Sequence, residues 1–324
     1  MKKTMHPITR AAIVAAIMFN AARSAGTVNQ TLTNFAVGIA GDTADDLANF
    51  IAPVVPTGAQ NGQFKEFNDT DAFRVYETAR AIGGKRNRIE FDAEDQHFNC
   101  KPQGLEIGVD DAERDPNGSP LGIERAKIRT LVSNSNRGHA KKVFDTIKKV
   151  KAVTGGVGNW TDDDVDPVAE IDTQIETILT DTGMMPNRMV LGVGAWKVVK
   201  NHPLIKGRLS DNQKEGATLT QFASMLLNPN IEIKVGVVSV NANKPGRAAN
   251  KVNIIGAEVF IFIASDAPDQ FDPSFAKTFM VDSTPISNVK EYRDDSCDSD
   301  IYTTGWGEDI QVVSTMCAKR IAVS

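Results

Sequence analysis

The chain has 324 residues, enough for one large domain or two ordinary ones with a sizeable core. Its hydrophobic fraction is 41%, and no apolar run approaches the roughly 20 residues that span a bilayer, which argues against a membrane protein. The net charge is -5; residues 1–41 carry +4, which leaves -9 for the remainder. An acidic body does not bind nucleic acid by phosphate neutralisation, although a basic arm could contact it weakly.

The first 24 residues have the pattern of a secretory signal peptide, because bases precede the apolar Ala11–Phe19 and small residues follow. An exported binding protein or enzyme with a cleaved leader is therefore one alternative. Because the chain retains Met1, we instead interpret residues 1–50 as an N-terminal arm that gains order by packing on something else. The arm ends in a short predicted helix to Phe50, in which Thr43 and Asp46 form a capping box.

Residues 62–110 differ in character, because short segments there alternate apolar and polar residues as strands do. Gly83-Gly84 indicates a turn, and the bases Lys85, Arg86 and Arg88 lie at its tip. The pattern predicts a long two-stranded hairpin with no helix to cover it. Since an isolated hairpin is marginal in water, we expect it to lie on another surface. The aromatic residues that would make this contact are Phe64, Phe67, Phe73 and Tyr76.

One long helix is predicted over residues 119–153. Ser119 suits the N-cap and Pro120 the first helical position. A single stripe of mostly apolar residues follows at three- and four-residue steps: Ile128, Leu131, Val132, Ser135, His139, Val143, Ile147 and Val150. About 33 residues at 1.5 Å each give roughly 50 Å, which is long for a globular helix. The helix is therefore interpreted as a strut.

The second half of the chain mixes helices and strands. Helices are predicted over residues 166–182 and 217–227, and a strand, a tight turn and a helix over residues 189–203. The run at 257–265 is almost continuously apolar, which indicates a strand buried on both faces. The order of the predicted elements indicates an α+β fold, because extended β segments come first, a long helix follows, and mixed helices and strands come last.

Chemical motifs are not recognisable in this sequence. The carboxylates of Asp162, Asp163 and Asp164 could supply the oxygen ligands that calcium prefers, but they lack the spacing of a calcium loop. The four histidines lack the paired spacing of a metal site. The three cysteines are far apart, which argues against a disulfide framework and suits a reducing compartment. We therefore predict no catalytic residue, no metal and no cofactor, and a protein that is not an enzyme.

Two stretches resemble the major capsid proteins of tailed bacteriophages. In Ile51–Phe91, an IAP…P segment leads into a hairpin with the pair Phe73-Arg74. In Trp160–Leu209, a tryptophan loop, DP…I, a helix, G..PN, a strand and W…NHP.I follow in the same order as in that family. The similarity covers roughly residues 45–324 and is weakest after Leu227.

The resemblance implies the Hong Kong 97-like capsid fold, with an N-terminal arm, an E-loop β-hairpin, a peripheral domain with a long spine helix, and an axial domain. The expected division places the arm at residues 1–50 and the E-loop hairpin with its base at 51–118. The spine helix of the peripheral domain would occupy 119–165 and mainly the axial domain 166–290. Residues 291–324 would return to the peripheral domain as strands.

The function that the resemblance implies is that of a coat protein, many copies of which assemble as pentamers and hexamers into an icosahedral shell around double-stranded DNA. Such a protein would assemble in the bacterial cytoplasm and end in the virion, touching DNA only weakly and no membrane. Scaffold, portal and decoration proteins are further candidate partners. An encapsulin-like nanocompartment shell is the alternative with the same fold.

The basic hairpin tip suggests a specific contact between copies. An acidic segment of a neighbouring copy would receive it, either Asp110, Asp111 and Glu113 or Asp162, Asp163 and Asp164. A solvated tip is the alternative, since exposed ion pairs contribute little free energy.

Overall fold

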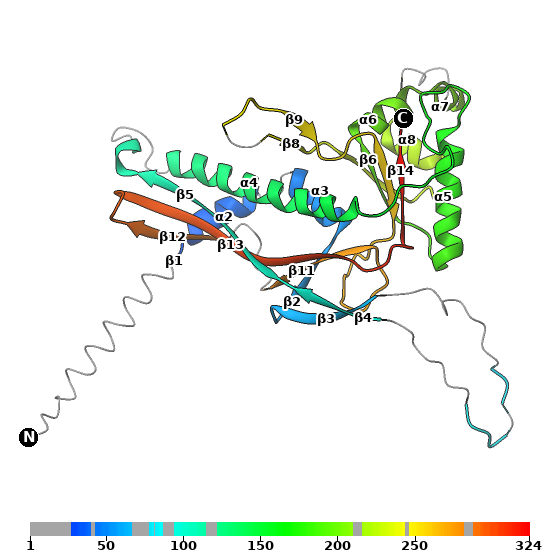
Figure 1. Ribbon diagram of the computed structural model, residues 1–324, viewed down its shortest axis with the longest axis horizontal. Coiled ribbons are helices and arrows are strands. Elements are labelled where there is room, and N and C mark those ends of the chain that lie inside the picture. Colours follow the sequence, from blue (N-terminus) through cyan, green and yellow to red (C-terminus); the bar gives the residue numbers. More distant parts are fainter. Residues whose placement is uncertain are drawn as a thin grey trace, which may run out of the picture. The chain divides into compact units, whose positions relative to one another are not determined.

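The computed structural model describes residues 27–39, 43–66, 78–80, 82–86, 94–114, 122–209, 216–243, 246–281 and 288–324 (Figure 1). The chain divides into two compact units. The first unit comprises Met1–Asp42, Pro102–Asn136 and Asp282–Gly307, and the second comprises Thr43–Lys101, Arg137–Val281 and Glu308–Ser324. Each unit is therefore built from three separate stretches of the chain.

The first unit combines strands with helical segments. Its elements are β1 (Thr27–Val28), α2 (Gln30–Ile39), β5 (Lys101–Asp110), the 3-10 helix η1 (Asp111–Glu113), β12 (Val289–Asp294) and its share of α4 (Gly122–Ile147) and β13 (Ser299–Val312). β12 pairs antiparallel with β1 and with β13, and β5 also pairs with β13. A small core that includes Leu32, Val109, Ile128 and Tyr302 joins these elements.

The second unit contains the remaining elements. They are α3 (Thr43–Ile51), β2 (Val54–Thr57), β3 (Asn61–Glu66), β4 (Glu94–Asn99), α5 (Pro167–Thr182), β6 (Arg188–Gly192), α6 (Val193–Asn201), α7 (Pro203–Arg208), α8 (Leu219–Ser224), β7 (Glu232–Gly236), β8 (Ser239–Asn241), β9 (Lys251–Asn253), β10 (Glu258–Phe262), β11 (Ala276–Val281) and β14 (Ala318–Ala322). β14, β10, β6 and β7 form a sheet in that order, with β6 and β7 parallel.

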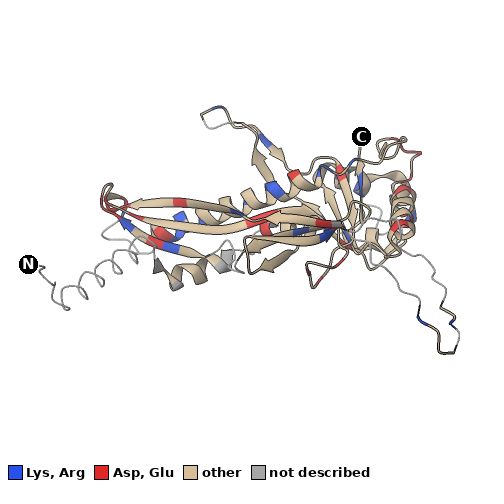
Figure 2. Ribbon diagram, turned by 60° about the horizontal axis from the view of Figure 1, so that its bottom comes forward, with Lys and Arg blue, Asp and Glu red and all other residues tan. Residues whose placement is uncertain are grey.

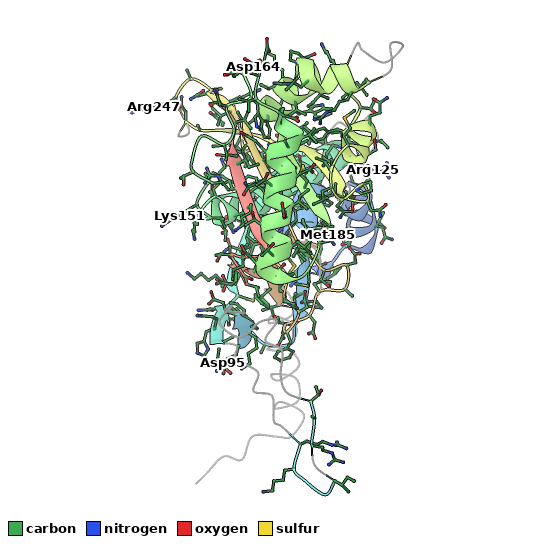
Figure 3. The ribbon with its side chains drawn as sticks, turned by 90° about the vertical axis from the view of Figure 1, so that its right-hand side faces the viewer. Asp95, Arg125, Lys151, Asp164, Met185 and Arg247 are labelled. Carbon is green, nitrogen blue, oxygen red and sulfur yellow. The ribbon has the colours of Figure 1, made fainter. Side chains whose placement is uncertain are left out.

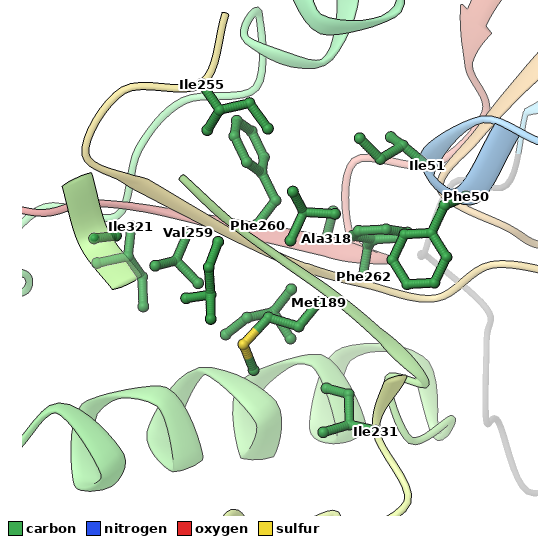
Figure 4. Close-up of a cluster of buried hydrophobic side chains, with 14 of the residues drawn as sticks. Phe50, Ile51, Met189, Ile231, Ile255, Val259, Phe260, Phe262, Ala318 and Ile321 are labelled. Carbon is green, nitrogen blue, oxygen red and sulfur yellow. The ribbon is translucent and has the colours of Figure 1, made fainter. Parts of the chain in front are cut away.

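The core of the second unit lies on both faces of this four-stranded sheet. Val259, Phe260, Ile261 and Phe262 of β10 are all nearly inaccessible to solvent, which confirms the prediction of a strand buried on both faces. Figure 4 shows the apolar side chains around the sheet, with α5 along one face. This sheet is therefore the rigid platform of the second unit.

The predicted strut is α4, Gly122–Ile147. The residues of its stripe from Ile128 to Ile147 are all buried, which confirms the helical periodicity. The predicted cap at Ser119 lies outside the described residues. The helix ends at Ile147 rather than Val153 because the following residues bond to β14. Arg320 donates to the carbonyl oxygens of Lys148 at 2.9 Å and Val150 at 3.1 Å, and its own carbonyl accepts from the Val153 N–H at 2.8 Å.

Two other expectations differ from the structure. The helix expected over 217–227 spans only Leu219–Ser224; Pro229 lies close behind, and the residue before a proline is disfavoured in helices. In the expected arm, the described helices α2 and α3 pack in the cores of their own units, so this part does not depend on another surface for order. In the part of the chain that the structure describes, no helix has the length and apolar character that crossing a membrane requires.

Candidate assembly surfaces

The base of the predicted hairpin is anchored in the core of the second unit. β3 and β4 pair antiparallel from Asn61↔Asn99 to Glu66↔Glu94. The rings of Phe64 and Phe98 lie 5.2 Å and 4.4 Å from that of Phe279 on β11. A side chain at Gly62 would collide with the Phe98 ring, so the close approach there requires glycine.

This packing corrects one expectation. Phe64 is only 3% exposed within its own chain, so its side chain is already covered and offers no surface to a neighbour. The other aromatic candidates, Phe67, Phe73 and Tyr76, lie outside the described residues, as does Arg88. For them the expected contact stays a prediction.

The described part of the hairpin tip is exposed. Gly83 has a φ of 81°, which places the turn where the sequence predicts it. Arg80 donates to the carbonyl oxygen of Gly84 at 3.1 Å. Lys85 and Arg86 are exposed and form no ion pair among the described residues, and the apolar Ile82 is completely exposed. The tip therefore presents two bases beside one apolar side chain.

The first acidic segment is already engaged within its own unit. Asp110 caps η1 by accepting from the Ala112 N–H at 2.8 Å. A hydrogen bond from Arg293 at 2.6 Å lowers the pKa of Asp111. A hydrogen bond from Lys127 likewise lowers the pKa of Glu113.

More acids than bases take part in this network. Arg293 also faces Asp295, Asp298 and Asp300, and Arg114 contacts both Asp300 and Glu124. Figure 2 marks the acidic positions in red on the ribbon. The surface of this network therefore remains negatively charged, because its bases do not neutralise all of its carboxylates.

The second acidic segment is a loop of the second unit, and its side chains are exposed. Asp162, Asp163 and Asp164 are exposed, and none of them forms an ion pair with a described residue. The Asp162 carboxylate accepts from the Asp164 N–H, at 3.2 Å. This segment is called the acidic loop below.

The backbone of the acidic loop is fixed by the motif residues on either side. Trp160 is buried, and its Nε1–H donates to Glu170 on α5 at 2.6 Å. His202 of the NHP motif caps α7 by accepting from the Leu204 N–H at 3.3 Å through Nδ1, and its Nε2 lies 3.2 Å from the Asp162 carbonyl oxygen. Trp160 and His202, which belong to the family motifs, therefore hold the backbone of the acidic loop in place.

A buried charged cluster lies on α4, and sequence reasoning did not find it. His139, which the sequence places on the apolar stripe, contacts Glu308 of β13, and Lys142 contacts the same carboxylate. The only sequence signal was a histidine in an apolar stripe. No group of three or more His, Cys, Asp or Glu side chains suited to a metal occurs in the described ranges.

Comparisons with known proteins agree with this fold. The family model "Phage major capsid protein E" matches residues 133–293. A "Major capsid protein" of Burkholderia phage BcepMu is 24% identical over 271 residues, covering 81% of this chain and 86% of its own. A "Major capsid protein" of Pseudomonas phage JBD67 is 27% identical over 232 residues, covering 68% and 72%.

Solved structures give the same result. A phage-related protein from Bordetella bronchiseptica RB50 superimposes with a TM-score of 0.71 at 26% identity, covering 91% of this chain and 97% of its own. The mature capsid of bacteriophage PhiM1 (0.53, 12%, 86% of each chain) and the SrpI encapsulin of Synechococcus elongatus (0.52, 9%, 93% and 94%) share the fold. The fold and the named relatives together support a phage major capsid protein with the Hong Kong 97-like fold.

Proposed function

We propose that many copies of this coat protein close into an icosahedral shell of pentamers and hexamers around double-stranded DNA. Assembly would take place in the cytoplasm of the host bacterium. The role is mechanical rather than catalytic: a rigid sheet and helix carry a hairpin that extends from each copy onto a neighbour.

The main support for this proposal is the hairpin whose base is formed by β3 and β4. Its base is fixed by Phe64 and Phe98 against Phe279, so the direction in which the strands leave the core is set. At the tip, Ile82, Lys85 and Arg86 are exposed and form no ion pair with a described residue. A fixed base with an uncovered apolar and basic tip is a costly arrangement for a monomer and a useful one for a shell.

The target we propose for the tip is the acidic network of a neighbouring copy around Asp110, Asp111 and Glu113. The network contains more acids than bases, so two further cations would be attracted to it. Its internal ion pairs hold the carboxylates in place before any contact is made.

Self-assembly is tested by sedimentation velocity and negative-stain electron microscopy of the purified chain, alone and after co-expression with the other head proteins. We expect closed shells, or rings of five and six copies. A chain that stays a monomer under both conditions would contradict the proposal.

The tip contact is tested with Arg86→Glu. We expect slower assembly and a lower yield at low salt, with less difference at high salt because screening weakens both attraction and repulsion. The matched control is Lys197→Glu, an exposed base on α6 with the same change in charge. If Arg86→Glu assembles like wild type at both salt concentrations, the tip contact is wrong.

The nanocompartment alternative differs in cargo. Particles isolated from cells that carry the phage should protect double-stranded DNA from nuclease. Particles that hold an enzyme and no protected DNA would favour the encapsulin-like role.

A further inference from the structure

The β8–β9 hairpin of the second unit is exposed over most of its length. β8 and β9 pair from Ser239↔Asn253 to Asn241↔Lys251, and no other strand continues this sheet among the described residues. Every described residue from 246 to 253 is exposed. This hairpin, residues 239–253, is called the finger below. Apart from Val240, which packs partly buried against the core, the hairpin buries little and therefore contributes little to the stability of its own chain.

The finger is nevertheless held in one conformation. Asn241 Oδ1 accepts from the N–H groups of Asn243 at 3.2 Å and Asn250 at 2.9 Å. Asn243 Nδ2 donates to the carbonyl oxygen of Ala248 at 2.7 Å. At the base, the Ile254 N–H donates to Val238, and both of these side chains are buried. A loop ordered by its own amides, without a core, is pre-organised for contact with something outside the chain.

The charge of the finger is of one sign. The stretch from 235 to 257 contains three bases and no acid. Arg247 and Lys251 are exposed and form no ion pair among the described residues; Lys244 lies outside them. Figure 2 shows the hairpin with basic residues only. A basic, pre-organised finger fits an acidic and equally rigid surface.

The acidic loop is such a surface, and it belongs to the same unit. Asp163 and Asp164 are exposed without an ion pair, and the loop backbone is held by His202 and Trp160 as described above. Figure 3 shows Arg247 and Asp164 toward the same end of the unit, on different elements. They form no ion pair with each other, so both remain available.

We propose that the finger of one copy docks on the acidic loop of the next copy, with Arg247 and Lys251 facing Asp163 and Asp164. In a head-to-tail arrangement each copy offers its finger to one neighbour and its acidic loop to the other. A head-to-tail contact that closes makes a ring. The inference rests on the proposed function, since it assigns this contact to the rings of the shell.

The contact is tested first by charge exchange. Arg247→Glu with Lys251→Glu should lower the shell yield at low salt by at least about tenfold, while circular dichroism stays unchanged because both side chains are exposed and unpaired. Adding Asp163→Lys and Asp164→Lys should restore the yield. The matched control, Lys149→Glu with Lys151→Glu, makes the same charge change outside the finger and should assemble normally.

Two outcomes of the exchange would overturn the proposal. The first is a reversed finger that assembles like wild type. The second is a loss of assembly that the exchanged loop does not restore, which would point to another partner such as nucleic acid.

A disulfide test does not depend on closed shells. In a Cys297→Ser background, which removes the exposed native thiol, Arg247→Cys with Asp163→Cys should give a covalent ladder ending at five and six copies. Lys151→Cys with Asp163→Cys should give none. Shells without a ladder overturn the finger contact and leave the proposed function intact. If wild type forms neither shells nor rings, alone or with the other head proteins, the proposed function fails. A covalent ladder would then still support the finger contact, and its absence would overturn it.

Discussion

Glu308 and His139 form an ion pair inside the second unit, with Oε2 and Nδ1 2.7 Å apart and the side chains only 2% and 1% exposed. Lys142 Nζ contacts the other carboxylate oxygen at 2.6 Å. Burial alone would raise the pKa of Glu308, but the hydrogen bonds and charges of His139 and Lys142 lower it to about 2. The cluster therefore stabilises the fold only while the carboxylate is ionised.

Replacement of this carboxylate should weaken the fold. We expect Glu308→Gln to lower the free energy of unfolding by on the order of 3 kcal/mol, because it removes the anion that contacts the buried His139 ring and the Lys142 ammonium group. The pKa of Glu308 lies below its ordinary 4.5, so its contribution is present above that pH and is lost as the pH falls toward 2. Urea titrations between pH 7 and 2 should show a smaller loss for the variant than for wild type. Asp145→Asn, which breaks an exposed pair with Lys141, should cost less than about 1 kcal/mol.

Glu170 should be needed for the tryptophan loop. Its Oε2 accepts from Trp160 Nε1 at 2.6 Å and from the Gly158 N–H at 2.8 Å. Glu170→Ala leaves both donors without their partner and should cost roughly 1–3 kcal/mol, with a change in tryptophan fluorescence. Glu170→Gln keeps an acceptor and should cost less. Equal losses in the two variants would show that the acceptor is not the cause.

Gly158 should tolerate no side chain. Its φ is 98°, and a Cβ would lie 2.1 Å from the carbonyl oxygen of Ala322. We expect Gly158→Ala to destabilise the chain by more than about 2 kcal/mol in chemical denaturation. Gly155→Ala is the control, because Gly155 has a φ of 102° but open space around it. A similar loss at both positions would mean that backbone strain alone, and not the collision, determines the effect.

Arg320 should not be replaceable by lysine. Its guanidinium donates to two carbonyl oxygens beyond the end of α4 and to Glu258 at 2.7 Å, a fan of contacts that one ammonium group cannot reproduce. We expect Arg320→Lys to lower the stability by about 1–2 kcal/mol. Hydrogen exchange of residues 148–153 should increase in the variant. Unchanged exchange there would refute the capping role.

The fold was predictable where a local pattern is strong. The stripe from Ile128 to Ile147 and the apolar run of β10 each give the right element, because burial repeats with the period of the backbone. A short helix also lies where the Thr43 signal predicts one, although α3 begins at Thr43 itself. The family resemblance then supplied the architecture, which no local pattern contains.

The remaining features depend on residues far apart in the sequence. The early end of α4 is caused by Arg320, which lies 170 or more positions away. The partner of His139 could not be predicted either, because a histidine on an apolar stripe does not identify Glu308. Nor does the sequence predict that Lys277 is completely buried and bonds to Asp272. The sequence did not predict the finger for another reason. Asparagine residues interrupt the alternation of apolar and polar residues in its strands, and their side-chain hydrogen bonds, rather than an apolar core, order the loop.

The long separation between β2 and β11 has a consequence for synthesis. Thr57 and Met280 are hydrogen-bonded although 223 positions separate them, and Phe279 of the same strand supports the hairpin base. A ribosome therefore releases the hairpin residues long before their supporting ring has been translated. Until that ring exists, a nascent chain has no ordered hairpin to offer to finished copies nearby. We therefore expect incomplete chains to stay out of a growing shell until β11 has been translated.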